Sequence, residues 1–238
     1  MSEAGQQAMV KGQTGFLTAV SAIVQKDLRI ERHTRQTISI MVMFSLVTVV
    51  MFNFALETNL AAVRDVATGL LWATILLAGT LGLTRSLAIE RENRAFDALL
   101  LAPVNRSAIY VGKVVSISVF TLLLEAILVL LFIAFFNKPF WRTPVLLVLV
   151  LGTIGYVGIG VLITSMTVQT RSRDVLLPVL LLPLSLPLVL PAATAVSAYM
   201  FPQTPPWSEV QSPVLLVAAY DLIMLSIGFF AYRYVIEN

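Results

Sequence analysis

Residues 89–113 read IERENRAFDALLLAPVNRSAIYVGK, a charged segment between two long apolar stretches, and the chain is organised around this segment. On a helical wheel one arc of the segment is apolar and the opposite arc is polar, as in a helix that lies along an interface. The apolar arc holds Ile89, Phe96, Leu99, Leu100 and Pro103, and the polar arc holds Glu90, Asn93, Arg94 and Asp97. Glu92 and Leu101 depart from the pattern. The segment is therefore predicted to form a short helix across the membrane face.

Two features end this helix and begin the next one. Pro103 cannot continue a helix, because it has no backbone N–H and its ring clashes with the preceding turn. Asn105 or Ser107 can cap the following helix by accepting a hydrogen bond from a free N–H group. A short amphipathic helix of this kind either docks into a groove on a partner protein or only anchors a loop among the lipid headgroups. The wheel pattern alone leaves both interpretations open.

The composition predicts an integral membrane protein. Of the 238 residues, 58% are hydrophobic and only 12% are charged, whereas an ordinary soluble domain is about a quarter charged. The net charge of +3 is small, and no basic block with interleaved aromatic residues suggests nucleic-acid binding. The absence of cysteine excludes disulfides, thiolate metal sites and covalent heme attachment through this chain.

Six apolar runs are long enough to cross a hydrocarbon core, which takes about 20 helical residues. They cover residues 38–56, 66–87, 109–136, 144–166, 175–200 and 213–234. We expect residues 1–15 to form a flexible cytoplasmic tail, because they are polar and contain no apolar core. The remainder, residues 16–238, is expected to form one all-α membrane domain.

Residues 16–30 are amphipathic and predict a helix that lies in the inner interface before the first span. Its apolar arc holds Phe16, Leu17, Val20, Ile23, Val24 and Leu28. Asp27 interrupts this apolar arc.

The distribution of basic residues predicts the orientation of the chain in the membrane. With a cytoplasmic amino terminus, only Arg64, Lys138 and Arg142 of the 16 lysines and arginines fall outside, and the other 13 fall inside. The positive-inside rule therefore places both termini and residues 85–113 in the cytoplasm.

The chain lacks a phosphate-binding loop of its own. Gly112-Lys113 is followed by Val114, and Arg106 stands where the pattern GxxxxGK[ST] requires glycine. An ATPase would therefore be a separate subunit, and the segment at residues 89–103 is the expected place for it to bind. In that hypothesis Phe96, Leu99 and Leu100 fill a groove on the ATPase, and the rim contacts come from Glu90, Arg91, Glu92 and Arg94.

The fifth span carries Pro178, Pro183, Pro187 and Pro191. Each proline removes one backbone donor, and irregular backbone at membrane depth survives only where protein or a water-filled cavity satisfies it. The pattern predicts either a broken or re-entrant hairpin near the outer face or a kinked helix packed in a bundle. Residues 202–207 are expected to form an outer loop, with Trp207 as an interface anchor.

Two acidic residues lie within the apolar runs, and four closely spaced glycines lie within the fourth run. Glu125 and Asp221 are functional candidates by default, because ionisable groups are costly in lipid and face the bundle interior. Glu125 either makes a polar contact at a subunit seam or an interior hydrogen bond, and Asp221 is expected to have a structural role in the outer third of its span. The glycines at 152, 155, 158 and 160 are expected to serve helix packing.

The sequence indicates a transporter component and not an enzyme. His33, the only histidine, lies among charged residues and is expected to be a solvated surface group. A Ser-His-Asp arrangement is therefore unavailable within the membrane. We expect no catalytic residue, no metal site and no cofactor held by this chain.

The order of residues in the opening segment resembles the loop of type-2 ABC transporter permeases that couples to the ATPase. The resemblance rests on Glu90, Arg91, Glu92, the leucines at 99–101, Pro103, Arg106, Gly112 and Lys113. More narrowly, LLLAPVNRSAIYVGK is similar to the heme exporter permease family of bacterial cytochrome c maturation, and the similarity extends over nearly the whole chain from Phe16. Arg94-Ala95 occupies a place where the family often has glycine, and Asp97 one where it often has glutamate.

This resemblance implies a membrane subunit that works with a dedicated ABC ATPase in the bacterial inner membrane. It also implies two copies of the permease, heme as possible cargo, ATP on the partner subunit, and membrane partners that pass heme to a periplasmic heme chaperone. Two rival functions remain open at this point. One is a permease for another cargo such as a drug or polysaccharide, and the other is a non-transporting scaffold that transmits ATP energy to a neighbouring heme-handling subunit.

Overall fold

The computed structural model describes residues 15–56, 60–92, 104–167, 173–201 and 205–237. The described part forms helices joined by short turns and contains no strand, so the predicted all-α fold is confirmed. Its helices are α2 (Phe16–Thr34), α3 (Gln36–Leu56), α4 (Leu60–Glu92), α6 (Arg106–Phe136), α7 (Thr143–Thr167), α8 (Arg173–Ala198) and α9 (Trp207–Glu237).

Six of these helices are long and apolar enough to cross a membrane, in agreement with the six predicted spans. The candidate spans are Gln36–Leu56, Val66–Ser86, Arg106–Phe136, Thr143–Thr167, Val175–Ala198 and Trp207–Tyr234. The largest difference from the sequence is at the last span, which begins at Trp207 and not at residue 213. Pro213 is the seventh residue of α9, where it removes the regular hydrogen bond to the Glu209 carbonyl without ending the helix.

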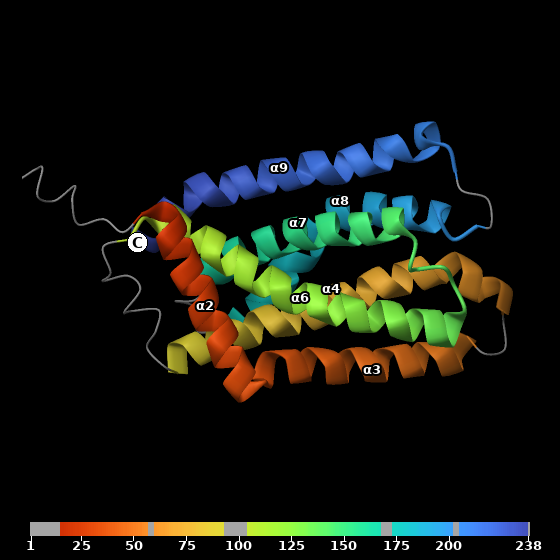
Figure 1. The fold of residues 1–238 in the computed structure, drawn as a ribbon, viewed down its shortest axis with the longest axis horizontal. Helices are drawn as coiled ribbons and strands as arrows, with labels where there is room; N and C mark the ends of the chain where they lie inside the picture. The colour runs from red at the N-terminus through yellow and green to blue at the C-terminus, as the bar shows by residue number, and fades with distance from the viewer. Residues whose placement is uncertain (1–14, 57–59, 93–103, 168–172, 202–204, 238) are drawn as a thin grey trace, which may run out of the picture.

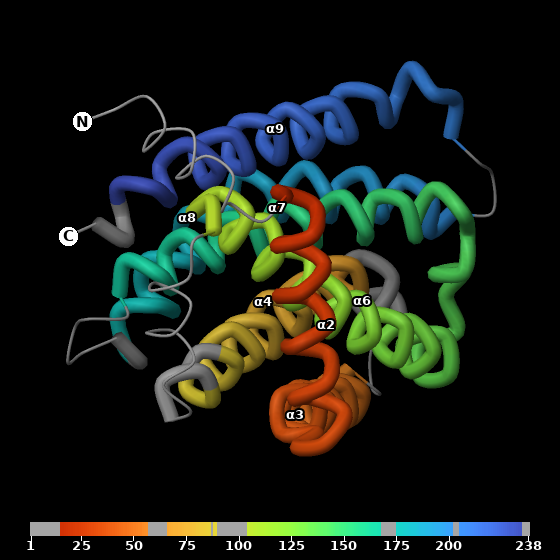
Figure 2. Tube along the Cα trace, turned by 60° about the vertical axis from the view of Figure 1, so that its left-hand side comes forward, coloured from red at the N-terminus to blue at the C-terminus, as the bar shows by residue number. Residues whose placement is uncertain are grey.

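The six spans lie side by side with alternating directions, and α2 runs across one end of the bundle (Figure 1). Figure 2 shows the same crossing from another side, with α2 in front of α6. We call this the α2 end. The rings of Phe16 and Phe229 lie 6.2 Å apart, and the Ser107 hydroxyl donates to the Phe229 carbonyl at 2.9 Å. The start of α2, the start of α6 and the last turns of α9 therefore meet at the α2 end.

The interior of the bundle is formed by α4 and α7. Two thirds of the apolar window of each of these helices is buried, compared with about a sixth for α3 and α9 (67% against 17%). The glycines of α7 explain this close packing, because a Cβ at Gly158 would meet a methyl of Leu225 at 2.7 Å. Likewise a Cβ at Gly152 would meet the ring of Trp72, and one at Gly160 would meet Leu83. The predicted packing role of these glycines is confirmed.

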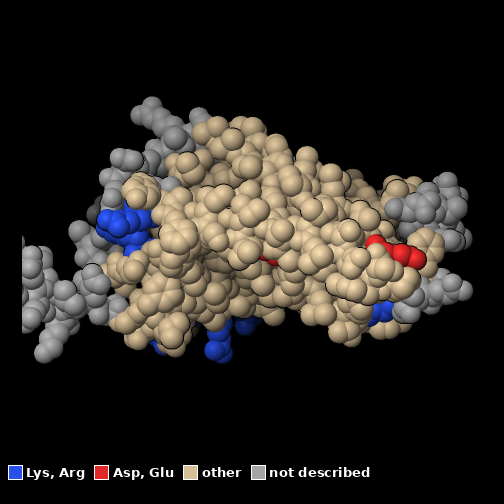
Figure 3. Space-filling view, turned by 90° about the horizontal axis from the view of Figure 1, so that it is seen from above, with Lys and Arg blue, Asp and Glu red and all other residues tan. Residues whose placement is uncertain are grey.

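The outer surface of the bundle is apolar. Figure 3 shows one face of the molecule as a broad surface with very few charged groups. On α3 and α9, which form much of the periphery, large side chains such as Met43, Phe54, Leu222 and Phe230 are 62–71% exposed. In water such a surface would be unfavourable, and in a bilayer it faces lipid or a membrane partner.

The fifth span differs from the predicted hairpin. The structure contains one uninterrupted helix, α8, with Pro178, Pro183, Pro187 and Pro191 all inside it. A break between two short helices is therefore not found, and the alternative of a continuous proline-containing helix describes α8. The reason is that a proline fixes φ at a value compatible with a helix, so that the helix continues although individual hydrogen bonds are lost.

Candidate functional site

The first feature of the α2 end is a buried ion pair that joins α2 to α6. The Nζ of Lys113 donates to Oδ2 of Asp27 at 2.8 Å, and the Nζ of Lys26 lies 3.2 Å from Oδ1. Lys113 is 5% exposed and Asp27 is 7% exposed. The neighbouring Gly112 lets α2 approach closely, because a Cβ there would lie 2.9 Å from Cγ2 of Ile23. One dipeptide of α6 therefore supplies both the close contact and the charge that hold α2.

The second feature is the corner between α2 and α3. Arg35 has a φ of 51°, in the left-handed region, and its N–H donates to the Glu31 carbonyl at 2.7 Å. The Glu31 carboxylate turns toward the following helix, where it accepts from the N–H of Ile38 at 2.8 Å and of Thr37 at 3.3 Å. Glu31 thus satisfies two of the N–H groups that the start of a helix leaves free. The direction of α3 is fixed relative to α2.

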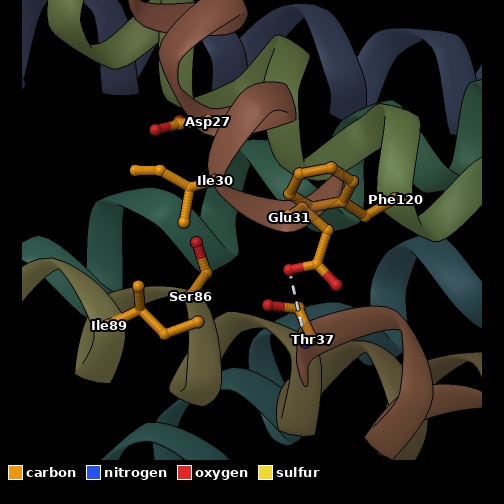
Figure 4. A pocket seen from close by; sticks show the side chains of 7 residues that line it. All are labelled: Asp27, Ile30, Glu31, Thr37, Ser86, Ile89 and Phe120. Carbon is orange, nitrogen blue, oxygen red and sulfur yellow. Dashed lines mark hydrogen bonds between the residues drawn. The ribbon is translucent and has the colours of Figure 1, made fainter. Parts of the chain in front are cut away.

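The third feature is a small cavity where α2, α3, α4 and α6 meet (Figure 4). Its volume of about 20 Å³ is enough for a water molecule. It is lined by Asp27, Ile30, Glu31, Thr37, Ser86, Ile89 and Phe120. Beside it, Arg85 of α4 donates to Gln36 of α3. We call the ion pair, the corner and this cavity the polar frame of the α2 end.

The first turns of α6 also reach the far side of the bundle. Asn105 caps α6 by accepting from the N–H of Ser107 at 3.0 Å, as one of the two predicted caps. The Tyr110 hydroxyl donates to the Gly158 carbonyl of α7 at 3.0 Å, and its ring centroid lies 5.4 Å from that of Tyr232 in α9. The start of α6 is therefore fixed to α2 on one side and to α7 and α9 on the other.

The two acidic residues within the spans have different surroundings. Glu125 of α6 is 4% exposed and accepts a hydrogen bond from the hydroxyl of Thr153 in α7. Within this chain Glu125 thus makes an interior hydrogen bond.

Asp221 of α9 faces α7 at Gly155, where a Cβ would clash with Oδ1. That oxygen has no hydrogen-bond partner among the described residues. Asp221 lies near the middle of α9 and opposite the middle of α7, not in the outer third of its span. The earlier start of α9, at Trp207, accounts for this difference.

Comparison with known proteins identifies the family. A sequence model described as "CcmB protein" matches residues 18–238, which is nearly the whole chain. The chain belongs to the CcmB family. Three curated relatives, each named "Heme exporter protein B", are 26–28% identical to it. The one from Bradyrhizobium diazoefficiens is 27% identical over 223 residues, which cover 90% of this chain and 96% of the relative.

The two other relatives agree with this assignment. The protein from Rhodobacter capsulatus is 28% identical over 170 residues, 70% of this chain and 77% of the relative. The protein from Paracoccus denitrificans is 26% identical over 213 residues, 89% of this chain and 95% of the relative. The chain is therefore a multi-pass membrane subunit of the heme exporter B family, and its relatives carry the name of a transport protein.

The predicted docking segment lies largely outside the described residues. Arg94, Phe96, Leu99 and Leu100 fall in the range 93–103, which the structure does not describe. Glu90, Arg91 and Glu92 form the last turn of α4, and their side chains are also outside the description. The structure does describe the two helices that flank this segment, α4 before it and α6 after it.

Sequence reasoning missed the main contacts of the polar frame. Asp27 stood out only as an interruption of an apolar arc, and Gly112-Lys113 only as part of a family pattern. An acidic residue on the apolar face of one helix and a lysine inside an apolar run are together a signal for a buried pair. His33 is exposed, with Nδ1 3.2 Å from the Arg29 carbonyl, so the prediction of a surface histidine is confirmed.

Proposed function

We propose that this chain is the permease subunit of an ABC-type heme exporter complex in a bacterial inner membrane, needed for c-type cytochrome biogenesis. Its relatives are named heme exporters, and its sequence has no Walker A loop, which calls for a separate ATPase subunit. The bias of lysine and arginine supports an orientation with both termini in the cytoplasm. Heme is the proposed cargo, and ATP binds to the partner ATPase.

The attachment of α6 at the α2 end carries the proposal of mechanical coupling. The proposed ATPase-docking segment at residues 89–103 leads directly into α6, whose Lys113 holds α2 and whose Tyr110 holds α7. A displacement of the docking segment would therefore move α6 together with α2, and would act on the bundle interior through α7. Coupling of this kind requires that the ATPase binds the two conformations of the permease with different affinity.

The proposed assembly contains two permease chains, the ATPase, and membrane partners that hand heme to a periplasmic chaperone. The names of the relatives favour heme over a drug or polysaccharide as the cargo. The scaffold hypothesis predicts that ATP drives release of heme from the chaperone without translocation. His33 is on the exposed face of α2 and outside the spans, so we assign it no role as a heme ligand within the membrane.

The experiment that tests this function uses the purified complex in sealed vesicles. We expect ATP-dependent accumulation of heme, and we expect the L99D/L100D variant to insert into the membrane but lose both the ATPase in a pull-down and the accumulation. Undiminished co-purification of the ATPase would refute the docking assignment. Chaperone-bound heme released without accumulation would favour the scaffold, and accumulation of another cargo but not heme would overturn the heme assignment.

A further inference from the structure

The helix α2 presents only basic and uncharged residues on its exposed side. Its two acidic residues, Asp27 and Glu31, are turned inward and are 7% and 4% exposed. Arg29 and Arg32 are exposed, and so is Arg35 at the corner before α3. At 100° per residue Arg29 and Arg32 lie about 60° apart on the helical wheel, on the side opposite Asp27. The charges of α2 thus alternate in sign along the sequence, and the fold separates them. We call the three arginines the basic patch.

The basic patch has no counter-charge within the described part of the chain. Asp27 is engaged by Lys113 of α6 at 2.8 Å, and the Glu31 carboxylate accepts from the backbone N–H groups that begin α3. None of the three arginines forms an ion pair with a described residue. The patch is therefore a surface of uncompensated positive charge, open to an anion from outside the chain.

The fold keeps the basic patch at the level of the membrane surface. A single residue, Arg35, joins α2 to α3, which is the first candidate span. Arg29 lies seven residues before Gln36, and in a helix that continued the direction of α3 it would stand about 10 Å beyond the start of the span. Instead α2 runs across the end of the bundle (Figure 1). All three arginines therefore stay near the depth at which α3 begins.

The exposed side of α2 also has an apolar edge. Leu17 is 79% exposed, the largest fraction among the large apolar side chains of the described residues. Leu28 is half-buried and lies only about 20° from Leu17 on the wheel. Arg32 follows about 40° further round, so the apolar edge adjoins the basic patch. Leucine beside arginine on one exposed surface is typical of a helix that lies at a lipid–water interface.

An anionic lipid matches both parts of this surface. The phosphate oxygens of its headgroup accept charge-assisted hydrogen bonds from guanidinium groups, and its acyl chains can bury the leucines. A free phosphate ion would neutralise the arginines but would leave Leu17 in contact with water. Clusters of lysine and arginine next to a membrane span are, moreover, typical of segments that bind anionic lipid.

We propose that the exposed side of α2 binds anionic phospholipid, with the headgroup phosphates on the basic patch and with Leu17 and Leu28 among the upper parts of the acyl chains. The ion pair of Asp27 and Lys113 joins α2 to α6, so bound lipid holds both helices at the membrane surface. This assignment requires only that α3 crosses the bilayer. It does not depend on the cargo or on how the ATPase binds.

Fluorescence quenching in vesicles tests the choice of lipid. The chain contains no cysteine, so Gln25→Cys gives one labelling site for a fluorophore, at an exposed position between Arg29 and Arg32 on the wheel. The full chain is reconstituted in phosphatidylcholine, and phosphatidylglycerol or phosphatidylcholine with a nitroxide near the headgroup is titrated in. We expect half-maximal quenching at an about five-fold lower mole fraction of the phosphatidylglycerol, since one basic residue near an anionic membrane is worth about five-fold in binding.

The control position is Ser208→Cys, which is exposed at the start of α9 and is expected to show no preference for phosphatidylglycerol. Equal quenching by the two lipids at Gln25→Cys would overturn the proposal. Absence of quenching by either lipid, or a preference of the same size at Ser208→Cys, would do so as well.

A pair of variants tests the arginines themselves. In the labelled protein R29Q/R32Q should abolish the preference for phosphatidylglycerol, whereas R29K/R32K keeps the charge and should retain most of it. High salt should weaken the preference of the original protein. R29Q/R32Q should still retain the ATPase in a pull-down, which separates this result from a failure of the docking segment. An undiminished lipid preference in R29Q/R32Q would contradict the proposal, and loss of the ATPase with that preference intact would assign the patch to the ATPase instead.

Discussion

Asp27 and Asp221 are equally buried, each 7% exposed, but the molecule surrounds them in opposite ways. Asp27 lies at the α2 end between two lysine ammonium groups, at 2.8 Å and 3.2 Å. Asp221 lies in the middle of the bundle against Gly155, and its Oδ1 has no hydrogen-bond partner in the described part of the chain. The two sites show that burial of an acid does not by itself reveal what the acid is for.

The difference separates a structural role from a functional candidate. The ion pair of Asp27 fixes α2 on α6, and the rest of the polar frame supports the same contact. The unsatisfied oxygen of Asp221 contributes no such bond, and an acid in this state within a membrane span is costly to keep. We therefore expect substitutions at Asp27 to act mainly on stability, and substitutions at Asp221 to have little effect on it.

The largest effect is expected from Asp27→Leu, which leaves the buried Lys113 without its partner. Breaking a buried ion pair costs about 3–5 kcal/mol. The free energy of unfolding can be measured with SDS in mixed detergent micelles. The double variant D27L/K113M removes both charges and should recover to within about 1 kcal/mol of the original protein. A double variant as unstable as D27L would show that the ion pair is not the source of the loss.

A smaller loss of unfolding free energy is expected from Gly155→Ala, which tests the packing around Asp221. The added Cβ would clash with the Asp221 carboxylate. Overpacking of this kind costs about 1–3 kcal/mol. The matched control is Gly69→Ala in α4, where a Cβ would meet nothing within 4 Å. The same unfolding measurement should show Gly69→Ala unchanged or slightly stabilised, and an equal loss for both variants would contradict the described contact.

Glu31→Ala tests the corner between α2 and α3. The substitution removes the acceptor of the Thr37 and Ile38 N–H groups, and loss of a helix cap costs about 1 kcal/mol. Hydrogen exchange at these two amides should rise in the variant. Glu209→Ala, at an exposed position in the first turn of α9, provides a control in which the α3 amides should exchange as before.

The smallest effect on stability is expected from Asp221→Asn. The substitution preserves the size of the side chain, and Oδ1 has no hydrogen bond to lose. We expect the free energy of unfolding to change by less than about 1 kcal/mol, compared with a much larger loss for the same chemical change at Asp27. Similar losses for Asp221→Asn and Asp27→Asn would remove the distinction between the two sites.

The sequence predicted correctly those features that depend on neighbouring residues, and it did not predict contacts between residues far apart in the chain. The end of α3 at Leu56 and a cap at Asn105 or Ser107 follow from residues next to one another in the chain, and the structure has the helix end at Leu56 and the cap at Asn105. The partner of Asp27 is 86 positions away, at Lys113, and although both residues interrupt apolar patterns, neither pattern states which residue the charge meets. The outcome at the prolines of α8 was open for the same reason, because local chemistry permits both a break and a continuous helix.

The sequence by itself determined that this is a membrane protein with six candidate spans. Hydropathy and helix length are properties of consecutive residues, so both can be read without the fold. Tertiary structure alone decided which polar groups are satisfied. In the sequence Asp27 interrupts the apolar arc of an interfacial helix and Asp221 lies within a span, and neither position identifies what the acid contacts. Only the approach of Lys113 to one and of Gly155 to the other gives them different roles. The partner of a buried charge is set by the packing of helices in three dimensions, as for Asp27 and Lys113, which are 86 positions apart in the chain.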